Sequence, residues 1–299
     1  MRLFANLTPV CKSIIFFTVS EQKQGTLNWL DRHVPAGLVV DAAWLADHGY
    51  YPSLLHKYVS AGWLEKPANR VYRRPAGKLT WEQVVISLQT LLQTLLTVGG
   101  RTALELQGFA HYLPHDHREV HLYGPKPPPR WLEKLPVGVR FLYHNDKRLF
   151  RSEPVTRGLG NLSVDLRTNK RTSTDPIHGA FGLQHWGNGE WPLAISTPER
   201  AVLELLDELP AHETFHQVDK LMEGLSSLSP RRLQKLLADC RSVKVKRLFF
   251  FFADRHQHAW LKHLDKKSID LGKGKRMLVP GGKLDPVYQI TVPGDLNDV

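Results

Sequence analysis

The sequence contains little cysteine: only Cys11 and Cys240 occur in 299 residues, and they are far apart in the chain. Two such cysteines form neither the disulfide framework of a small secreted domain nor the thiolate set of a structural zinc site. The fold must therefore be held by an apolar core, which a chain of this length can build as one large domain or as two to three smaller ones. Sparse cysteine is also typical of proteins of the reducing cytoplasm.

Long hydrophobic runs are also absent. No apolar run reaches the roughly 18–20 residues that a membrane-spanning helix needs. Residues 14–19 form a short apolar patch that faintly resembles a signal peptide, but Lys12 interrupts the apolar region and no clean cleavage site follows. We expect residues 1–24 to be a disordered leader, or the product of a start codon assigned too far upstream. We therefore expect a cytoplasmic protein without a membrane partner.

Enzyme signatures are missing as well. The stretches GLGNL and GKGKR are too short and wrongly placed for a nucleotide-binding loop, and there is no GxSxG elbow. A metal-dependent nuclease would need two or three converging carboxylates. Its candidates would be Asp165, Glu190 and Asp265 with Lys267, and their spacing matches no nuclease pattern. We therefore expect no enzymatic activity and no cofactor.

Histidine is concentrated in two short segments. A zinc site usually needs four converging ligands, often including cysteine. No cysteine lies near the first segment, and Cys240 lies only loosely near the second. We therefore expect no bound metal at either cluster. The first comprises His111, His115, His117 and His121, and the second comprises His256, His258 and His263.

Positive charge is what the sequence has in excess. Lysine and arginine total 40 against 29 aspartates and glutamates, which gives a formal net charge of +11 and a pI near 9.6. Such an excess favours a polyanionic partner, such as nucleic acid or a membrane surface, whereas a charge that only maintains solubility is the alternative. The apolar fraction of 42% and the charged fraction of 23% are those of a folded globular protein.

Residues 26–75 predict an ordered series of short elements. An amphipathic helix is followed by the apolar strand GLVVD, whose Asp41 is placed to cap a second helix. Pro52 suits the first turn of a third helix, which Gly62 ends. The segments WLEK and RVYRR then alternate around PAN, which indicates a hairpin. This is the element order of a winged helix-turn-helix, in which the third helix enters the major groove of DNA.

Polar and basic residues of this region are placed where such a domain contacts DNA. The outer face of the third helix carries the candidates for reading bases, and the wing carries cations that meet phosphates. A protein-binding winged helix with a solvated basic wing is the alternative, but charge concentrated on the wing favours DNA. The predicted DNA-binding residues are Tyr51, Ser53, His56, Lys57, Lys66, Asn69, Arg70, Arg73 and Arg74.

The rest of the chain predicts two further regions, which make the fold class α+β. A mixed α/β region spans residues 79–195, and a helical, basic part of the same domain spans residues 196–299. With the winged helix-turn-helix at 25–78, this gives a small head followed by a larger domain with a helical C-terminal part. The run FFFF at 249–252 predicts a buried strand or helix segment.

Two helix starts carry the pattern of a capping box, in which the first side chain and the residue three positions later satisfy each other's backbone. One is Thr80 with Gln83. The other is Ser196 with Glu199, and Pro198 between them lies in the first turn.

The C-terminal part is uneven in charge. Residues 241–283 hold twelve lysines and arginines but only three aspartates, which predicts a second basic surface for DNA, for RNA or for an acidic face of another protein. A solvated helix face with a flexible basic loop is the alternative. Residues 199–223 are acidic and predict an exposed helical face, with pairing to the basic tract or to a partner as the alternative. The candidate residues of the second basic surface are Lys244, Lys246, Arg247, Lys273, Lys275 and Arg276.

Three segments together resemble one protein family. The stretch GLVVDAAWLADHGYYPSLLHKYVSAGWLEKPANRVYRRP resembles the N-terminal winged helix-turn-helix of AbiEi-type antitoxins from bacterial type IV toxin–antitoxin systems. STPERAVLELLDEL resembles a helix start that recurs in the antitoxin domain of that family, and the segment from VKVKRLFFFF to ITVP resembles its C-terminal part. The resemblance covers most of the chain from about Gly25, and the order of the segments is more specific than any one of them.

The resemblance implies two activities. The head would bind inverted repeats upstream of its own operon and repress it, with Ser53, His56 and Lys57 on the recognition helix. The remainder would counter a cognate nucleotidyltransferase-like toxin, either by touching that toxin or by acting on its target. A monomer or weak dimer is expected, because an inverted repeat needs two heads. The main alternative is a stand-alone winged-helix repressor whose C-terminal region dimerises or senses a ligand, and a winged-helix nuclease ranks behind it.

Overall fold

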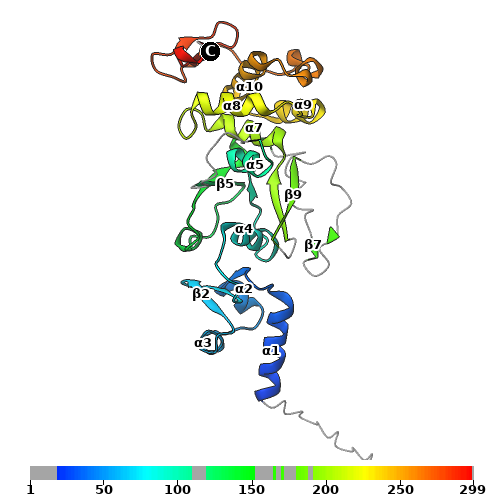
Figure 1. Cartoon of the computed structure of the whole chain (residues 1–299), viewed down its shortest axis with the longest axis vertical. Coiled ribbons are helices and arrows are strands. Elements are labelled where there is room, and N and C mark those ends of the chain that lie inside the picture. The colour runs from blue at the N-terminus through cyan, green and yellow to red at the C-terminus, as the bar shows by residue number, and fades with distance from the viewer. Residues whose placement is uncertain are drawn as a thin grey trace, which may run out of the picture.

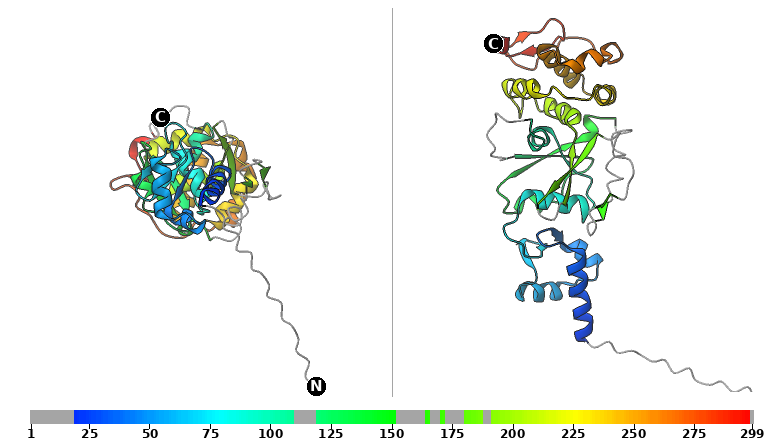
Figure 2. Two further views of the ribbon diagram at one scale, coloured as in Figure 1. Left: turned by 90° about the horizontal axis from the view of Figure 1, so that it is seen from below. Right: turned by 45° about the vertical axis from the view of Figure 1, so that its right-hand side comes forward.

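The computed structural model describes residues 19–109, 119–151, 164–165, 170–171, 180–187 and 191–297. The molecule is elongated, with the first helices at one end and the C-terminal strands at the other (Figure 1). Between them lie a sheet and a layer of helices (Figure 2). We call residues 19–78 the head and residues 79–297 the body. No helix among these described residues is both long and apolar enough to cross a membrane.

The head has the predicted element order. Its three-stranded sheet has the strand order β1-β3-β2, and all its pairs are antiparallel. Helix α1 begins inside the predicted leader, so part of residues 1–24 belongs to the head rather than to a disordered segment. The elements are α1 (Val19–His33), β1 (Val39–Asp41), α2 (Ala42–Asp47), α3 (Pro52–Ser60), β2 (Glu65–Ala68) and β3 (Val71–Arg73).

Local signals set these boundaries. The carboxylate of Asp41 accepts a hydrogen bond from the Trp44 backbone N–H at 2.8 Å, which caps α2 as predicted. Pro52 occupies the first turn of α3. Gly49 and Gly62 follow α2 and α3 with φ values of 84° and 74°, which residues with a side chain adopt at a cost. The helices pack around a small core of Leu30, Val34, Val40, Leu45, Tyr50, Leu54, Leu55, Tyr58 and Leu64.

The body is built on a mixed five-stranded sheet with the order β6-β5-β4-β10-β9. Strands β5 and β6 are parallel, as are β4 and β10, whereas β4–β5 and β9–β10 are antiparallel. Helix α4 lies between this sheet and the head, and α5 lies on the opposite side (Figures 1 and 2). The elements are α4 (Trp81–Thr90), β4 (Thr97–Val98), α5 (Gly100–Leu106), β5 (Glu119–Gly124), β6 (Arg140–Asn145), β9 (Phe181–Trp186) and β10 (Trp191–Ser196).

A layer of helices covers the far side of the sheet. Helix α10 is buried along most of its length, which confirms that the phenylalanine run lies in the core, in a helix rather than a strand. A C-terminal hairpin closes this end (Figure 1). The elements of this layer and of the hairpin are α7 (Pro198–Asp207), α8 (Phe215–Gly224), α9 (Pro230–Asp239), α10 (Val243–His256), β11 (Lys283–Leu284) and β12 (Thr291–Val292). Two short strands, β7 (Val164–Asp165) and β8 (Lys170–Arg171), pair with each other. The 3-10 helices are η1 (Leu132–Lys134), η2 (Asp146–Arg148), η3 (Ala259–His263), η4 (Lys266–Ser268) and η5 (Gly294–Asn297).

One predicted capping box is confirmed and the other is wrong. Thr80 and Gln83 satisfy each other's backbone N–H at the start of α4. At the start of α7 the N-cap is Thr197, which makes no side-chain cap. Ser196 stays in β10 and donates to Glu204 at 3.1 Å instead. The signal misled because the chain leaves the sheet one residue later than the pattern suggests.

The predicted exposed acidic face is also wrong. Four of its glutamates are buried, and each has a polar partner inside the protein. Glu204, for example, accepts hydrogen bonds from the Gly100 backbone N–H at 2.9 Å and from Arg200 Nε at 2.6 Å. Burial raises the pKa of Glu204, and Arg200 opposes that rise. These buried glutamates therefore make internal contacts of the body. They are Glu199, Glu204, Glu208 and Glu213.

The head and the body share one core. Leu38, Val39 and Val71 of the head belong to the same buried cluster as the sheet and the helices of the body. The Val39 backbone N–H donates to Ser87 Oγ on α4 at 2.8 Å. The head is thus packed onto the body rather than tethered to it by a linker. The predicted division at residue 195 likewise falls inside this single core, because α7 packs on α5 and β10.

Candidate nucleic-acid interface

Helix α3 presents one polar face to solvent. Leu54, Leu55 and Tyr58 point into the head, and the residues between them point outward. This is the orientation that the helical period predicts. The exposed residues of the helix are Pro52, Ser53, His56, Lys57 and Ser60.

Two exposed aromatic side chains flank α3. Tyr51 is the N-cap residue, is 58% exposed, and is among the predicted contacts. Trp63, which is 55% exposed, follows the helix and was not predicted. Its backbone N–H donates to the Tyr58 carbonyl at 2.9 Å, which fixes it at the junction with β2. The available signal was its position just after Gly62, outside the apolar period of the helix.

The tip of the wing is polar and fixed. Lys66, Asn69 and Arg70 are all exposed. Arg70 has a φ of 63°, the left-handed conformation that lets the chain turn between β2 and β3. The Ala42 backbone N–H donates to the Arg70 carbonyl at 2.8 Å, so the tip is tied to the start of α2. These contacts hold the Arg70 backbone in place while its side chain faces solvent.

Arg73 lies inside the protein rather than on the wing surface. It is 6% exposed, and its Nε pairs with Glu65 at 2.5 Å while Nη2 donates to the Gly77 carbonyl at 2.5 Å. A guanidinium that is buried and paired in this way has no surface to offer a phosphate. Arg73 is therefore removed from the predicted interface.

Arg74 ties the wing to α1. Its Nη1 donates to the carbonyls of Asp31 and Val34 at 3.0 Å each, and its Nη2 pairs with the Asp31 carboxylate. The side chain is about one quarter exposed. Because Asp31 already neutralises it, Arg74 contributes less to a polyanion surface than the sequence suggested. The residues that remain together on one exposed region of α3 and the wing are Tyr51, Ser53, His56, Lys57, Lys66, Asn69 and Arg70.

The predicted second basic surface is not one surface. Lys246 and Arg247 are buried, and Lys244 donates to the carbonyls of Asp207 and Leu209 at 2.5 and 2.9 Å. Lys244 and Arg247 make internal hydrogen bonds, and Lys246 is buried, so none of the three belongs to an open basic surface. The other three, Lys273, Lys275 and Arg276, are exposed on the loop that leads to the C-terminal hairpin.

Metal ligands do not converge in the described part of the chain, where no group of three or more suitable side chains is found. His256 pairs with Asp219 at 2.8 Å and His258 contacts the Met222 carbonyl at 2.8 Å, so both are tied into the body. His111, His115 and His117 lie outside the described residues, as does Glu190. The carboxylate of Asp265 accepts the Lys267 backbone N–H, which is a local turn contact rather than a nuclease site.

A histidine pair, of which His121 is buried and His144 partly exposed, lies at the β5–β6 edge of the sheet. His121 Nδ1 and His144 Nε2 are 3.1 Å apart, and His144 Nδ1 lies 2.9 Å from the Glu208 carboxylate. Burial, reinforced by the neighbouring His144, lowers the pKa of His121 to about 4. Because His121 is only 3% exposed, this chain of groups is closed to a substrate and is best explained as a structural network.

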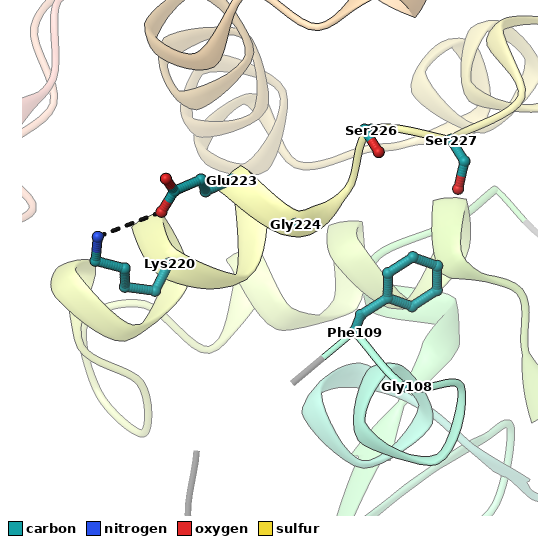
Figure 3. A pocket seen from close by; sticks show the side chains of 7 residues that line it. All are labelled: Gly108, Phe109, Lys220, Glu223, Gly224, Ser226 and Ser227. Carbon is teal, nitrogen blue, oxygen red and sulfur yellow. Dashed lines mark hydrogen bonds and ion pairs between the residues drawn. The ribbon is translucent and has the colours of Figure 1, made fainter. Parts of the chain in front are cut away.

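A hollow of about 780 Å³ lies between the end of α5 and the loop after α8. Figure 3 shows Phe109 on one side and Ser226 on the other. Lys220 and Glu223 form an ion pair of 3.3 Å at its edge. Both side chains of this pair are exposed to solvent.

Comparison with known proteins agrees with this architecture. A family model described as "Transcriptional regulator, AbiEi antitoxin, Type IV TA system" matches residues 117–293, and the model of the N-terminal domain of that antitoxin matches residues 23–115. Among solved structures, the RV2827C protein from Mycobacterium tuberculosis matches with 18% identity and a TM-score of 0.53, over 91% of this chain and 90% of that chain. At that identity the likeness shows a shared fold. Comparison with curated proteins found no match.

Proposed function

We propose a two-part function for this chain, which belongs to the AbiEi antitoxin family of transcriptional regulators of type IV toxin–antitoxin systems. The head binds operator DNA of the chain's own operon and represses it. The body counters a nucleotidyltransferase-like toxin, either by contact or by acting on the toxin's target. Neither part is an enzyme in this proposal. A regulator that binds its own operon acts where that DNA lies, which places it in the cytoplasm.

The observation that carries the DNA proposal is the exposed polar face of α3 together with the exposed polar and basic residues of the wing. Lys57, Lys66 and Arg70 supply cations that lack a carboxylate partner within the described residues. Ser53 and His56 lie on the same face of α3 and are placed to reach base edges when that helix enters the major groove. Phosphate contacts then supply affinity, and the two α3 residues supply sequence preference.

Two heads are needed to occupy an inverted repeat. Each chain offers one α3, so two copies bind as a weak dimer or as separate monomers on adjacent half-sites. Their spacing sets the spacing of the two half-sites.

The first experiment measures DNA binding by the full chain. Fluorescence anisotropy with the inverted-repeat DNA upstream of the operon should show salt-dependent binding. Lys57→Ala with Arg70→Ala should lower the slope of log K against log salt by up to about two, because each lost phosphate contact removes about 0.9. Lys235→Ala with Lys262→Ala, which removes two exposed charges at the opposite end, is the matched control. An unchanged slope in the head variant would reject the interface.

His56→Ala tests base reading by the same assay. We expect the preference for operator over unrelated DNA to fall, while binding to unrelated DNA changes little. Equal losses on both kinds of DNA would remove His56 from sequence readout.

The second experiment tests the antitoxin activity in cells. The product of the neighbouring gene is co-expressed with the wild-type chain or with the Lys57→Ala, Arg70→Ala variant. We expect both chains to restore growth, and only the wild type to repress an operon reporter. If the neighbouring gene is not toxic, or the full chain does not rescue growth, the stand-alone repressor becomes the better assignment.

A further inference from the structure

A proline-rich segment of the body, residues 125–130, lies beside the wing of the head. It follows β5 and leads into Trp131 and η1. In Figure 1 this connection descends from the sheet toward the head, on the side of β2. Three of its six residues are consecutive prolines, which hold the backbone extended and leave it little conformational freedom.

Trp131 contacts the head directly. Its indole N–H donates to the Asp41 carboxylate at 3.3 Å. Asp41 is paired with Val71 across β1 and β3, and the neighbouring Ala42 holds the carbonyl of Arg70 at the wing tip. The proline-rich segment therefore leads into Trp131, whose contact with Asp41 lies next to the tip of the wing.

The wing itself rests on the body. Ala68 at the end of β2 packs against the large core, and Val71 at the start of β3 belongs to it. Asn69 and Arg70 form the turn between them. A duplex that reaches this turn consequently passes close to the body surface next to the wing. A wing that projected freely would leave the body clear of the DNA.

The body surface at this place carries the charge that such a duplex needs. Lys126 and Arg130 are exposed, and neither has an acidic partner in the described part of the chain. The charged groups closest to them along the chain are Glu133 and Lys134, both exposed, which cancel each other. The path from Arg130 to Arg70 runs through Trp131, its hydrogen bond to Asp41, and the pairing of Asp41 with Val71. With Cα steps of about 3.8 Å and a strand spacing of about 5 Å, this path keeps the two arginines within one turn of duplex DNA, about 34 Å.

We propose that residues 125–130 form a second DNA-contacting element, in which Lys126 and Arg130 bind phosphates of the duplex next to those bound by the wing. This rests on the proposed function of the head and names a further part of the same interface. The segment adds affinity without reading sequence, because both side chains meet the backbone of the DNA. Its prolines keep the two cations in place before binding, so less conformational entropy is lost.

The test is Lys126→Ala with Arg130→Ala in the full chain, measured by anisotropy on operator DNA across a salt series. We expect the slope of log K against log salt to fall by about one to two, and affinity at about 0.1 M salt to weaken on the order of tenfold or more. The charge-retaining Lys126→Arg with Arg130→Lys should keep both. Lys235→Ala with Lys262→Ala, at the far end, should also keep both.

A second measurement locates the contact. The operator duplex is shortened stepwise on each side, and wild type is compared with the Lys126→Ala, Arg130→Ala variant. Once the duplex no longer extends past the wing, the two proteins should bind it equally well. If the wild type shows no salt-dependent DNA binding, this proposal falls together with the proposed function. If the wild type binds but the variant keeps the full slope, or differs on every duplex length, this proposal alone falls.

Discussion

Arginines on the head of this protein do different work depending on the side of the chain from which they project. Arg70 stands at the wing tip in solvent, whereas Arg73 is enclosed between Glu65 and the Gly77 carbonyl. Hydrogen bonds to a charged group contribute about 1.5–3 kcal/mol each when the group is buried. Arg73 therefore stabilises the wing, and Arg70 is free to bind a partner.

Replacing Arg73 should accordingly affect stability and leave DNA binding intact. We expect Arg73→Ala to lower the free energy of unfolding by about 2–4 kcal/mol, because it leaves Glu65 and a carbonyl without their donor. Urea denaturation followed by tryptophan fluorescence measures this loss. At a temperature where the variant is fully folded, the salt slope of DNA binding should equal that of wild type. A lowered slope would return Arg73 to the interface.

His121 makes the body sensitive to acid. Its pKa is lowered from 6.5 to about 4 in the folded chain, by burial first and then by His144. Between these two values the unfolded chain binds a proton at this residue and the folded chain does not, so protonation favours unfolding. The stabilising effect of a neutral His121 is fully present above about pH 6.5 and is lost as the pH falls toward 4. The other charged groups that face it are Glu208, Arg101 and His212.

A comparison of His121→Gln with wild type isolates this effect. The difference in pKa corresponds to about 3 kcal/mol over that interval. We expect the wild type to lose stability more steeply than the variant when urea unfolding is measured at pH 7.5 and again at pH 5. Parallel losses in the two proteins would show that other groups control the acid response.

At the scale of single elements, the helices of the head follow from local patterns, and the wing shows where such patterns stop. The outward face of α3 is given by its apolar period, and α2 by the Asp41 cap. In β3, Val71 and Arg73 occupy the same face because side chains alternate along a strand. A buried Val71 therefore implies a buried Arg73. The alternation along the strand could have predicted this, whereas the charge of Arg73 alone suggested an exposed position.

The body was harder to predict because its pairing is long-range. Strand β4 has only two residues and joins β5 to β10, which come from distant parts of the chain. A two-residue strand carries no readable alternation. Three buried glutamates of the 199–223 region, Glu199, Glu204 and Glu213, are paired with arginines from other turns or segments, namely Arg232, Arg200 and Arg101. Local charge patterns cannot reveal such partners.

Helix α10 fixes the basic loop that precedes the C-terminal hairpin. The buried Arg247 donates to the carbonyls of Leu271 and Gly274 at 2.7 Å each and to Gln289 at 3.3 Å. The side chains of the loop are exposed, but its backbone carbonyls accept hydrogen bonds from the buried Arg247. The predicted flexible basic loop is therefore anchored through a residue that the sequence placed on the surface.

Arg247→Leu should release this loop. Losing hydrogen bonds from a charged donor raises the population of locally open states, so trypsin should cut after Lys273 and Lys275 on the order of tenfold faster. Mass spectrometry of early digests measures the cleavage rate. Arg241→Leu, at an exposed position before α10, is the control and should leave the rate unchanged. Equal rates in Arg247→Leu and wild type would contradict the anchoring role.

For the whole molecule, the shared core of head and body is decisive. Val39 and Val71 are fully buried, and both lie in the cluster that includes the body. Removing residues 79–299 would expose this face of the head. The fold of the head therefore depends on the body, even though every residue of the proposed DNA interface on α3 and the wing lies within residues 1–78.

A substitution at Val71 tests this dependence without relying on the fragment's yield. Val71→Thr keeps the volume and adds a hydroxyl, which costs about 1–3 kcal/mol when buried without a partner. We expect that loss in the full chain by urea unfolding, with head and body unfolding together in one transition, because Val71 lies in the core that they share. A separate, earlier transition of the head alone in the variant would mean that the head buries Val71 by itself.

The same packing limits how such a protein can diversify. A regulator whose reading head is joined by a loose tether acquires a new target by recombination, since any compatible head can be exchanged whole. In this protein the inner face of the head forms part of the core of the body. Leu38 and Val39 lie in that core, and the Val39 backbone N–H donates to Ser87 of α4. A head exchanged from another protein would not match the body surface against which it has to pack. If α3 reads DNA as proposed, new sequence preferences should therefore arise by point changes on its outer face, with head and body inherited as one unit.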